Sequence, residues 1–115
     1  KINVTFTPHL IPMFRGILST IYLETKNGKG AKDIYNFLKN YHKHNYFVKI
    51  AKFNKPIGTG DVMNSNYCQI SVCENRKKNK IIIISAIDNL LKGGSGQAVQ
   101  NMNLAYNFNE NLGLK

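Results

Sequence analysis

The run KIIIISAI at residues 80–87 limits the folds open to this chain more than any other feature. Its apolar side chains occupy consecutive positions, so a strand formed there would place apolar groups on both of its faces. Such a strand is typical of the centre of a sheet, with cover on both sides. The run is far shorter than the roughly 18 apolar residues that a membrane-spanning helix needs. We therefore predict a sheet protein with this segment as its central strand.

Strand patterns cover four further segments, all upstream of the central run: residues 2–7, 17–23, 47–53 and 67–74. The first alternates between apolar and polar side chains, as expected for a strand with one buried face, and Pro8 ends it. The polar turn NRKKN at residues 75–79 predicts a hairpin that joins the last of these strands to the central one.

Two other segments predict helices. The first begins near Ala31, with Asp33 in its first turn and Lys43 in its last, as the helix dipole favours. Its apolar residues recur at helical spacing and should face the sheet: Ile34, Tyr35, Leu38 and Tyr41. The second helix should cover residues 95–107, after the glycine-rich sequence GGSG. Its buried stripe should consist of Ala98, Val99, Met102, Ala105 and Tyr106.

This order of elements predicts an α+β fold, a mixed and largely antiparallel sheet with helices on one face. A chain of 115 residues can bury one core but not two, so we expect one domain over residues 1–115. The other face of the sheet then needs a cover, which a second copy of the chain would supply. The loop KPIGTGD at residues 55–61 is expected to be a plain connector, with a lid or an interface arm as the alternative.

The formal net charge of +10 suggests a polyanion partner, because basic groups that bind phosphates release counterions. The basic residues are dispersed, however, and only RKKNK at residues 76–80 forms a cluster. Lys supplies 14 of the 16 basic side chains, whereas recognition of bases and phosphates favours Arg. We therefore expect a solvated basic surface and no nucleic-acid partner, and keep a basic interaction module as the alternative function.

Few residues of the chain are suited to catalysis. Cys68 and Cys73 are an odd number of positions apart on a predicted strand, so their side chains should point to opposite faces as free thiols in a reducing compartment. The three histidines lack the spacing of metal ligands, so no metal is expected. Neither GxGxxG nor GxxxxGK[ST] occurs. We expect a soluble, cytoplasmic protein that does not span a membrane.

Four segments carry more specific sequences: FTPHLIPMFRGILSTIY at residues 6–22, SNYCQISV at 65–72, SAIDNLLKGGSGQAVQNMN at 85–103 and ENLGL at 110–114. In this order they resemble the carboxy-terminal domain of the N-acetyl-gamma-glutamyl-phosphate reductase family, phosphorylating semialdehyde dehydrogenases of arginine biosynthesis. The resemblance covers almost the whole chain. It implies a fold similar to the catalytic and dimerisation domain of glyceraldehyde-3-phosphate and aspartate-semialdehyde dehydrogenases.

The resemblance also implies an activity, the reduction of an acyl phosphate to an aldehyde by NADPH through a thioester on a cysteine. The family places that cysteine in a GCYPT-like motif, which this chain lacks, so neither cysteine inherits the role and no catalytic residue is assigned. A Rossmann domain that binds most of the NADP should lie upstream, and the complete enzyme should be a homo-oligomer. The isolated chain should be inactive. Another semialdehyde dehydrogenase, such as an aspartate-semialdehyde dehydrogenase, remains the alternative.

Three residues are candidates for the site. The resemblance implies that His9, in FTPHL, lines the substrate pocket, and that Asn89, after the central strand, reaches the nicotinamide carboxamide. Arg15 is one of two arginines, and its guanidinium suits the carboxylate or acyl phosphate of the implied substrate. The alternative for Arg15 is a surface cation or a structural ion pair.

Overall fold

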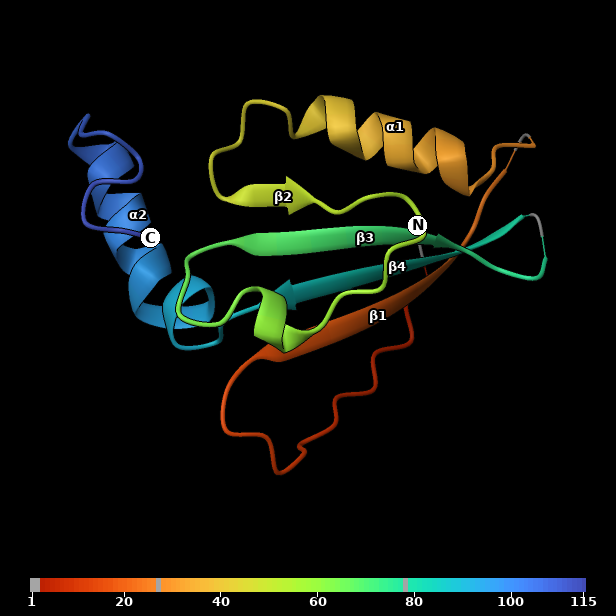
Figure 1. Cartoon of the computed structure of the whole chain (residues 1–115), viewed down its shortest axis with the longest axis horizontal. Helices are drawn as coiled ribbons and strands as arrows, with labels where there is room; N and C mark the ends of the chain where they lie inside the picture. The colour runs from red at the N-terminus through yellow and green to blue at the C-terminus, as the bar shows by residue number, and fades with distance from the viewer. Residues whose placement is uncertain (1–2, 27, 78) are drawn as a thin grey trace.

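The computed structural model describes residues 3–26, 28–77 and 79–115 and contains one sheet (Figure 1). Four strands lie in the order β1-β4-β3-β2: β1 (Ile17–Glu24), β2 (Val48–Ile50), β3 (Cys68–Glu74) and β4 (Lys80–Ile87). Strand β4 is antiparallel to both of its neighbours, whereas β2 is parallel to β3. The central position of the run at 80–87 and the mixed, largely antiparallel sheet are confirmed. Lys78, in the predicted basic cluster, lies outside the described residues.

The strand predicted at residues 2–7 is not formed in the described part of that segment. Ile2 lies outside the described residues, and residues 3–10 have no regular structure. Val4 and Phe6, which should have faced the core, are 79% and 82% exposed. An alternating pattern makes a segment able to form a strand, but a strand also needs a neighbouring edge with which to pair. No described strand pairs with residues 3–7.

Helix α1 (Ala31–Tyr41) covers one face of the sheet (Figure 1). Ala31 packs there with Val72 and Ile81, and three of the predicted stripe residues join them: Ile34, Tyr35 and Leu38. The fourth, Tyr41, is exposed, so its predicted burial is wrong. The helix ends before Lys43, which therefore lies outside the last turn.

The loop at residues 55–61 covers part of the opposite face. Ile57 and Val62 flank the 3-10 turn η1 (Thr59–Asp61) and form a second core cluster with Ala51 and Ala86. Ala86 and Ile81 are an odd number of positions apart on β4, so the two clusters lie on opposite faces. The apolar character of β4 is thereby used on both sides, and the loop is more than a connector.

Helix α2 (Gly96–Ala105) stands beside the end of the sheet, not on its face (Figure 1). It follows the π-helical turn η2 (Leu91–Ser95). Its predicted buried stripe is wrong, because four of the five residues are exposed and the fifth is partly buried: Ala98, Met102, Ala105 and Tyr106, and Val99. The helix instead buries Gly96, Gln100 and Asn103. Within the described residues, no helix is long and apolar enough to cross a membrane.

Candidate functional site

Asp88 is the centre of the candidate site. It follows the last residue of β4 and is 1% exposed. Its Oδ1 accepts hydrogen bonds from the backbone N–H groups of Leu90 at 2.9 Å and Leu91 at 3.1 Å. Its Oδ2 accepts one from the backbone N–H of Asn64 at 2.8 Å. The carboxylate therefore joins the end of β4 to the turn that precedes β3.

Arg15 approaches the same carboxylate. Its Nε lies 2.7 Å from Asp88 Oδ2, and its Nη1 donates a hydrogen bond to Asn64 Oδ1 at 3.0 Å. The contact of Nε with Asp88 is a close ion pair, and it does not have the geometry of a regular hydrogen bond. The Arg15 side chain is 20% exposed, and its Nη2 makes no hydrogen bond with the residues that the structure describes. One corner of the guanidinium is thus left for a ligand.

The charge of Asp88 follows from these contacts. Burial by itself raises the pKa of Asp88, but the Arg15 guanidinium and the N–H groups of Asn64, Leu91 and Leu90 together outweigh burial. The pKa of Asp88 is therefore held below its ordinary value. The carboxylate is charged at neutral pH, so its contact with Arg15 is ionic.

A second contact fixes Asn89 beside this pair. Asn89 Oδ1 accepts a hydrogen bond from the backbone N–H of Gly16 at 2.7 Å. Gly16 has a φ of +113°, and a Cβ at this position would stand 2.6 Å from the Cβ of Thr59, so glycine is required. Asn89 Nδ2 has no acceptor in the described part of the chain. It is therefore a donor that can meet a carboxamide oxygen.

The structure thus brings two of the three candidate residues together. Arg15 and Asn89 lie in two adjacent pairs, residues 15–16 and 88–89, which bind each other. His9 does not join them: it is exposed in the irregular amino-terminal segment, where its Nδ1 lies 3.1 Å from the carbonyl oxygen of Thr7.

Asp88 was missing from the predicted site residues. The available signal was an acidic residue directly after an apolar strand in a chain with six acidic side chains. Its partners, Arg15 and Asn64, are distant in sequence, so no local pattern could identify them.

The two cysteines are free thiols, as predicted. Cys68 Sγ lies 3.5 Å from Ser85 Oγ on the face that carries α1, and Cys73 Sγ lies 3.6 Å from Ser71 Oγ on the opposite face. Within the described ranges, no three His, Cys, Asp or Glu side chains are grouped to hold a metal ion.

Comparison with known proteins supports one family. Residues 1–89 match the family model of the semialdehyde dehydrogenase dimerisation domain. The N-acetyl-gamma-glutamyl-phosphate reductase of Staphylococcus saprophyticus is 46% identical over 99% of this chain and 33% of its own length. That of Brachyspira hyodysenteriae is 50% identical over 98% of this chain and 32% of its own length. The chain therefore spans about a third of the length of these curated relatives.

The fold has solved counterparts as well. The aspartate semialdehyde dehydrogenase II of Vibrio cholerae superposes with a TM-score of 0.62 over 84% of this chain and 29% of that protein. The two sequences are 20% identical, so this likeness concerns the fold alone. It confirms the predicted α+β fold class. With a family match over residues 1–89, the chain belongs to the semialdehyde dehydrogenase dimerisation-domain family.

Proposed function

We propose that the chain is the substrate-binding and dimerisation part of a cytoplasmic, NADPH-dependent N-acetyl-gamma-glutamyl-phosphate reductase. Such an enzyme reduces the acyl phosphate to N-acetylglutamate semialdehyde and releases phosphate. The observation that carries this proposal is identity of 46% and 50% to curated reductases over nearly the whole chain. An aspartate-semialdehyde dehydrogenase is favoured less, because the solved example shares the fold at only 20% identity.

In this proposal Arg15 orients the substrate. Two of its three guanidinium nitrogens are held by Asp88 and Asn64, so the group is fixed before a ligand arrives. Nη2, which has no hydrogen-bond acceptor in the described part of the chain, remains to donate to an anionic oxygen of the substrate. Asp88 then holds Arg15 in place. Arg15 can therefore form the structural ion pair through Nε and contact the substrate through Nη2.

Asn89 meets the cofactor in the same proposal. When bound, NADPH supplies the hydride, and the chain's own contribution is to orient the nicotinamide through Asn89 Nδ2. The contact with Gly16 uses only the side-chain oxygen of Asn89 and fixes which way the amide points. Gly93 and Gly94 are exposed next to it and leave room for close approach. His9 would line the substrate pocket from the amino-terminal segment.

Two substitutions separate these roles in the full-length enzyme. Arg15→Lys keeps a cation beside Asp88 but loses the forked N–H groups of the guanidinium. We therefore expect kcat/KM for the acyl phosphate to fall about 10- to 150-fold, which corresponds to the loss of one charge-assisted hydrogen bond. Asn89→Asp keeps the acceptor for Gly16 but removes the Nδ2 donor, so KM for NADPH should rise instead. Equal effects of both variants on both substrates would contradict the division of roles.

We also propose that β1 lies in the homo-oligomer interface. All eight residues of β1 are exposed, and one of its edges has no described neighbour. Its exposed apolar side chains occur on both faces: Ile17, Ile21 and Leu23, and Leu18 and Tyr22. An edge strand with this composition is an association surface, and a second copy of the chain would cover it.

Growth complementation tests the proposed function. The full-length gene should restore growth without arginine to a bacterial strain that lacks its own reductase. The 115-residue chain alone should not, because it carries no residue assigned to catalysis. Failure of the full-length gene, with the protein present in the soluble extract, would contradict the proposal.

A further inference from the structure

The buried face of α2 is polar. Gln100 and Asn103 are 8% and 1% exposed, whereas the apolar Met102 and Leu104 on the same helix are exposed. Buried amide groups destabilise a fold unless they are hydrogen-bonded. The burial of α2 therefore depends on specific polar contacts and not on a filled apolar core.

Gln100 contacts three separate parts of the chain through one side chain. Its Oε1 accepts hydrogen bonds from Lys92 Nζ at 2.6 Å and from Asn66 Nδ2 at 2.9 Å. Its Nε2 donates to Glu110 Oε1 at 2.7 Å. The acceptor end thus faces a cation and the donor end faces an anion, which is the favourable orientation for both charged partners.

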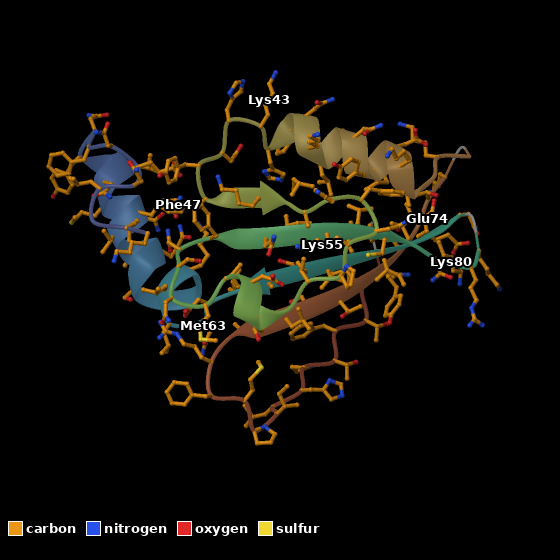
Figure 2. The ribbon with its side chains drawn as sticks, in the orientation of Figure 1. Lys43, Phe47, Lys55, Met63, Glu74 and Lys80 are labelled. Atoms are coloured by element: carbon orange, nitrogen blue, oxygen red, sulfur yellow. The ribbon has the colours of Figure 1, made fainter. Side chains whose placement is uncertain are left out.

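Lys92 connects Gln100 to the glycine-rich turn. It is the one charged residue in the sequence of η2, and its Nζ lies 5.6 Å from the ring centroid of Phe47. Phe47 lies between β2 and α2 (Figure 2). Burial lowers the pKa of Lys92, and the carboxylate of Glu110 acts in the opposite direction. The ammonium is partly withdrawn from water, and Gln100 Oε1 is its acceptor.

The same turn is packed tightly on Asn66. A Cβ at position 96, the first residue of α2, would overlap Asn66 Oδ1 and stand 2.9 Å from the carbonyl oxygen of Leu91, so only glycine fits there. Asn66 is 1% exposed, and its Nδ2 is held by Gln100. Gln100 thus holds the Asn66 amide in place against the backbone at Gly96, directly after η2.

The carboxy-terminal strap, residues 110–115, is the third partner. Glu110 and Leu112 accept hydrogen bonds at their carbonyl oxygens from Asn103 Nδ2, at 3.2 and 2.9 Å. The backbone N–H of Asn66 donates to the carbonyl oxygen of Lys115 at 2.6 Å. The strap is thus fixed to α2 and to the start of β3, and Glu110 presents a fixed carboxylate to Gln100.

We propose that Gln100 is the positioning residue of the glycine-rich turn. It couples Lys92 to Glu110 of the strap and so fixes the backbone of η2 beside Asn89. Gln100 makes no hydrogen bond to any of the three residues proposed to meet substrate or cofactor, His9, Arg15 and Asn89. The inference rests on the proposed function only in that Asn89 is taken to meet the nicotinamide.

An exchange of donor and acceptor tests the coupling in the 115-residue chain. Gln100→Glu places a second carboxylate about 2.7 Å from that of Glu110, whereas combining it with Glu110→Gln restores a donor opposite an acceptor. In 1H–15N spectra the glycine amides of η2 should shift in the single variant and return in the double variant. Gln97→Glu is the matched control, because Gln97 lies on the same helix and contacts only Asn101 among the described side chains.

The kinetic readout uses the full-length enzyme. Gln100→Glu should raise KM for NADPH about 10-fold, the effect of one charge-assisted hydrogen bond, and change kcat less than about 2-fold. The double variant should recover the wild-type KM. A general loss of stability would lower activity without this separation and without recovery.

Three results would overturn the positioning role. The first is a shift confined to amides of the strap, with the η2 glycines unmoved, and the second is a double variant that does not recover. The third applies if Gln100→Glu alone fails to fold, and it is a double variant that also fails to fold. A double variant that folds and has the wild-type spectrum would in that case support the role. The spectra need no cofactor, so the positioning role of Gln100 can fail while the proposed reductase activity holds. Equally, the reductase activity can fail while the positioning role holds.

Discussion

Replacing Asp88 with Asn would test whether this buried carboxylate stabilises the fold through its contacts with Arg15 and with the backbone N–H groups around it. The substitution removes one charge and changes one acceptor oxygen into a donor at a fully buried side chain. If the amide oxygen keeps the N–H groups of Leu90 and Leu91, the amide nitrogen faces two donors, the N–H of Asn64 and Arg15 Nε, at the present 2.8 and 2.7 Å. The opposite rotamer leaves Leu90 and Leu91 without an acceptor. Either orientation buries unpaired donors.

The size of the effect follows from the ion pair. Breaking a buried pair by removing one partner costs about 3 to 5 kcal/mol. The Arg15 side chain keeps 20% of its surface in water, which favours the lower end, about 3 kcal/mol. A domain of this size loses roughly 4 °C in Tm for each kcal/mol, so Tm should fall by about 12 °C.

Thermal and urea unfolding of the 115-residue chain at neutral pH, followed by circular dichroism, would measure this change. Asp61→Asn is the matched control, because Asp61 is exposed and accepts one backbone N–H, from Gly58, which an amide oxygen can still accept. The control should change the free energy of unfolding by less than about 0.5 kcal/mol. An equally small effect of Asp88→Asn would show that the buried carboxylate does not stabilise the fold.

Because folding lowers the pKa of Asp88, its stabilising contribution is full above the unfolded-state pKa of about 3.9 and is lost as pH falls through the folded-state pKa. Urea unfolding from neutral pH to about pH 3 should therefore show a smaller acid loss in Asp88→Asn than in wild type, and parallel curves would count against the ion pair. Gly16→Ala should destabilise the chain by about 2 to 4 kcal/mol through strain and overlap, whereas Gly60→Ala, with open space around it, should be nearly neutral, and equal unfolding midpoints would contradict the close approach. Ile21→Lys should lower the oligomer mass in light scattering, whereas Leu104→Lys on α2 should not, and the reverse result would move the interface from β1 to α2.

The elements with apolar periodicity could be predicted from the sequence. Strand β4 and three stripe residues of α1 follow from the spacing of apolar side chains, and the hairpin between β3 and β4 follows from the polar turn between two strand patterns. The amino-terminal segment shows the limit of this reasoning, because a correct alternation at residues 3–7 specifies no partner edge. The parallel pairing of β2 with β3 depends likewise on the path of the chain and not on a local pattern.

Polar burial could not be predicted in the same way. Helix α2 has a plausible apolar stripe, yet it buries Gln100 and Asn103, because their partners lie in segments that only the fold brings together. The pairing of Arg15 with Asp88 is another case, in which a candidate ligand-binding residue also has a structural partner. Amide and charged groups pair by geometry over long sequence distances, whereas hydrophobic periodicity is local.

The substrate preference of the full-length enzyme separates the proposed reductase from an aspartate-semialdehyde dehydrogenase. The assay is phosphate-dependent reduction of NADP with N-acetylglutamate semialdehyde, compared with aspartate semialdehyde at the same enzyme concentration. The two substrates differ by an N-acetyl group and one methylene, so kcat/KM for N-acetylglutamate semialdehyde should be at least about 100-fold higher, the discrimination expected when several polar groups of a site must be matched. Equal values of kcat/KM, or a preference for aspartate semialdehyde, would contradict the proposed reductase activity.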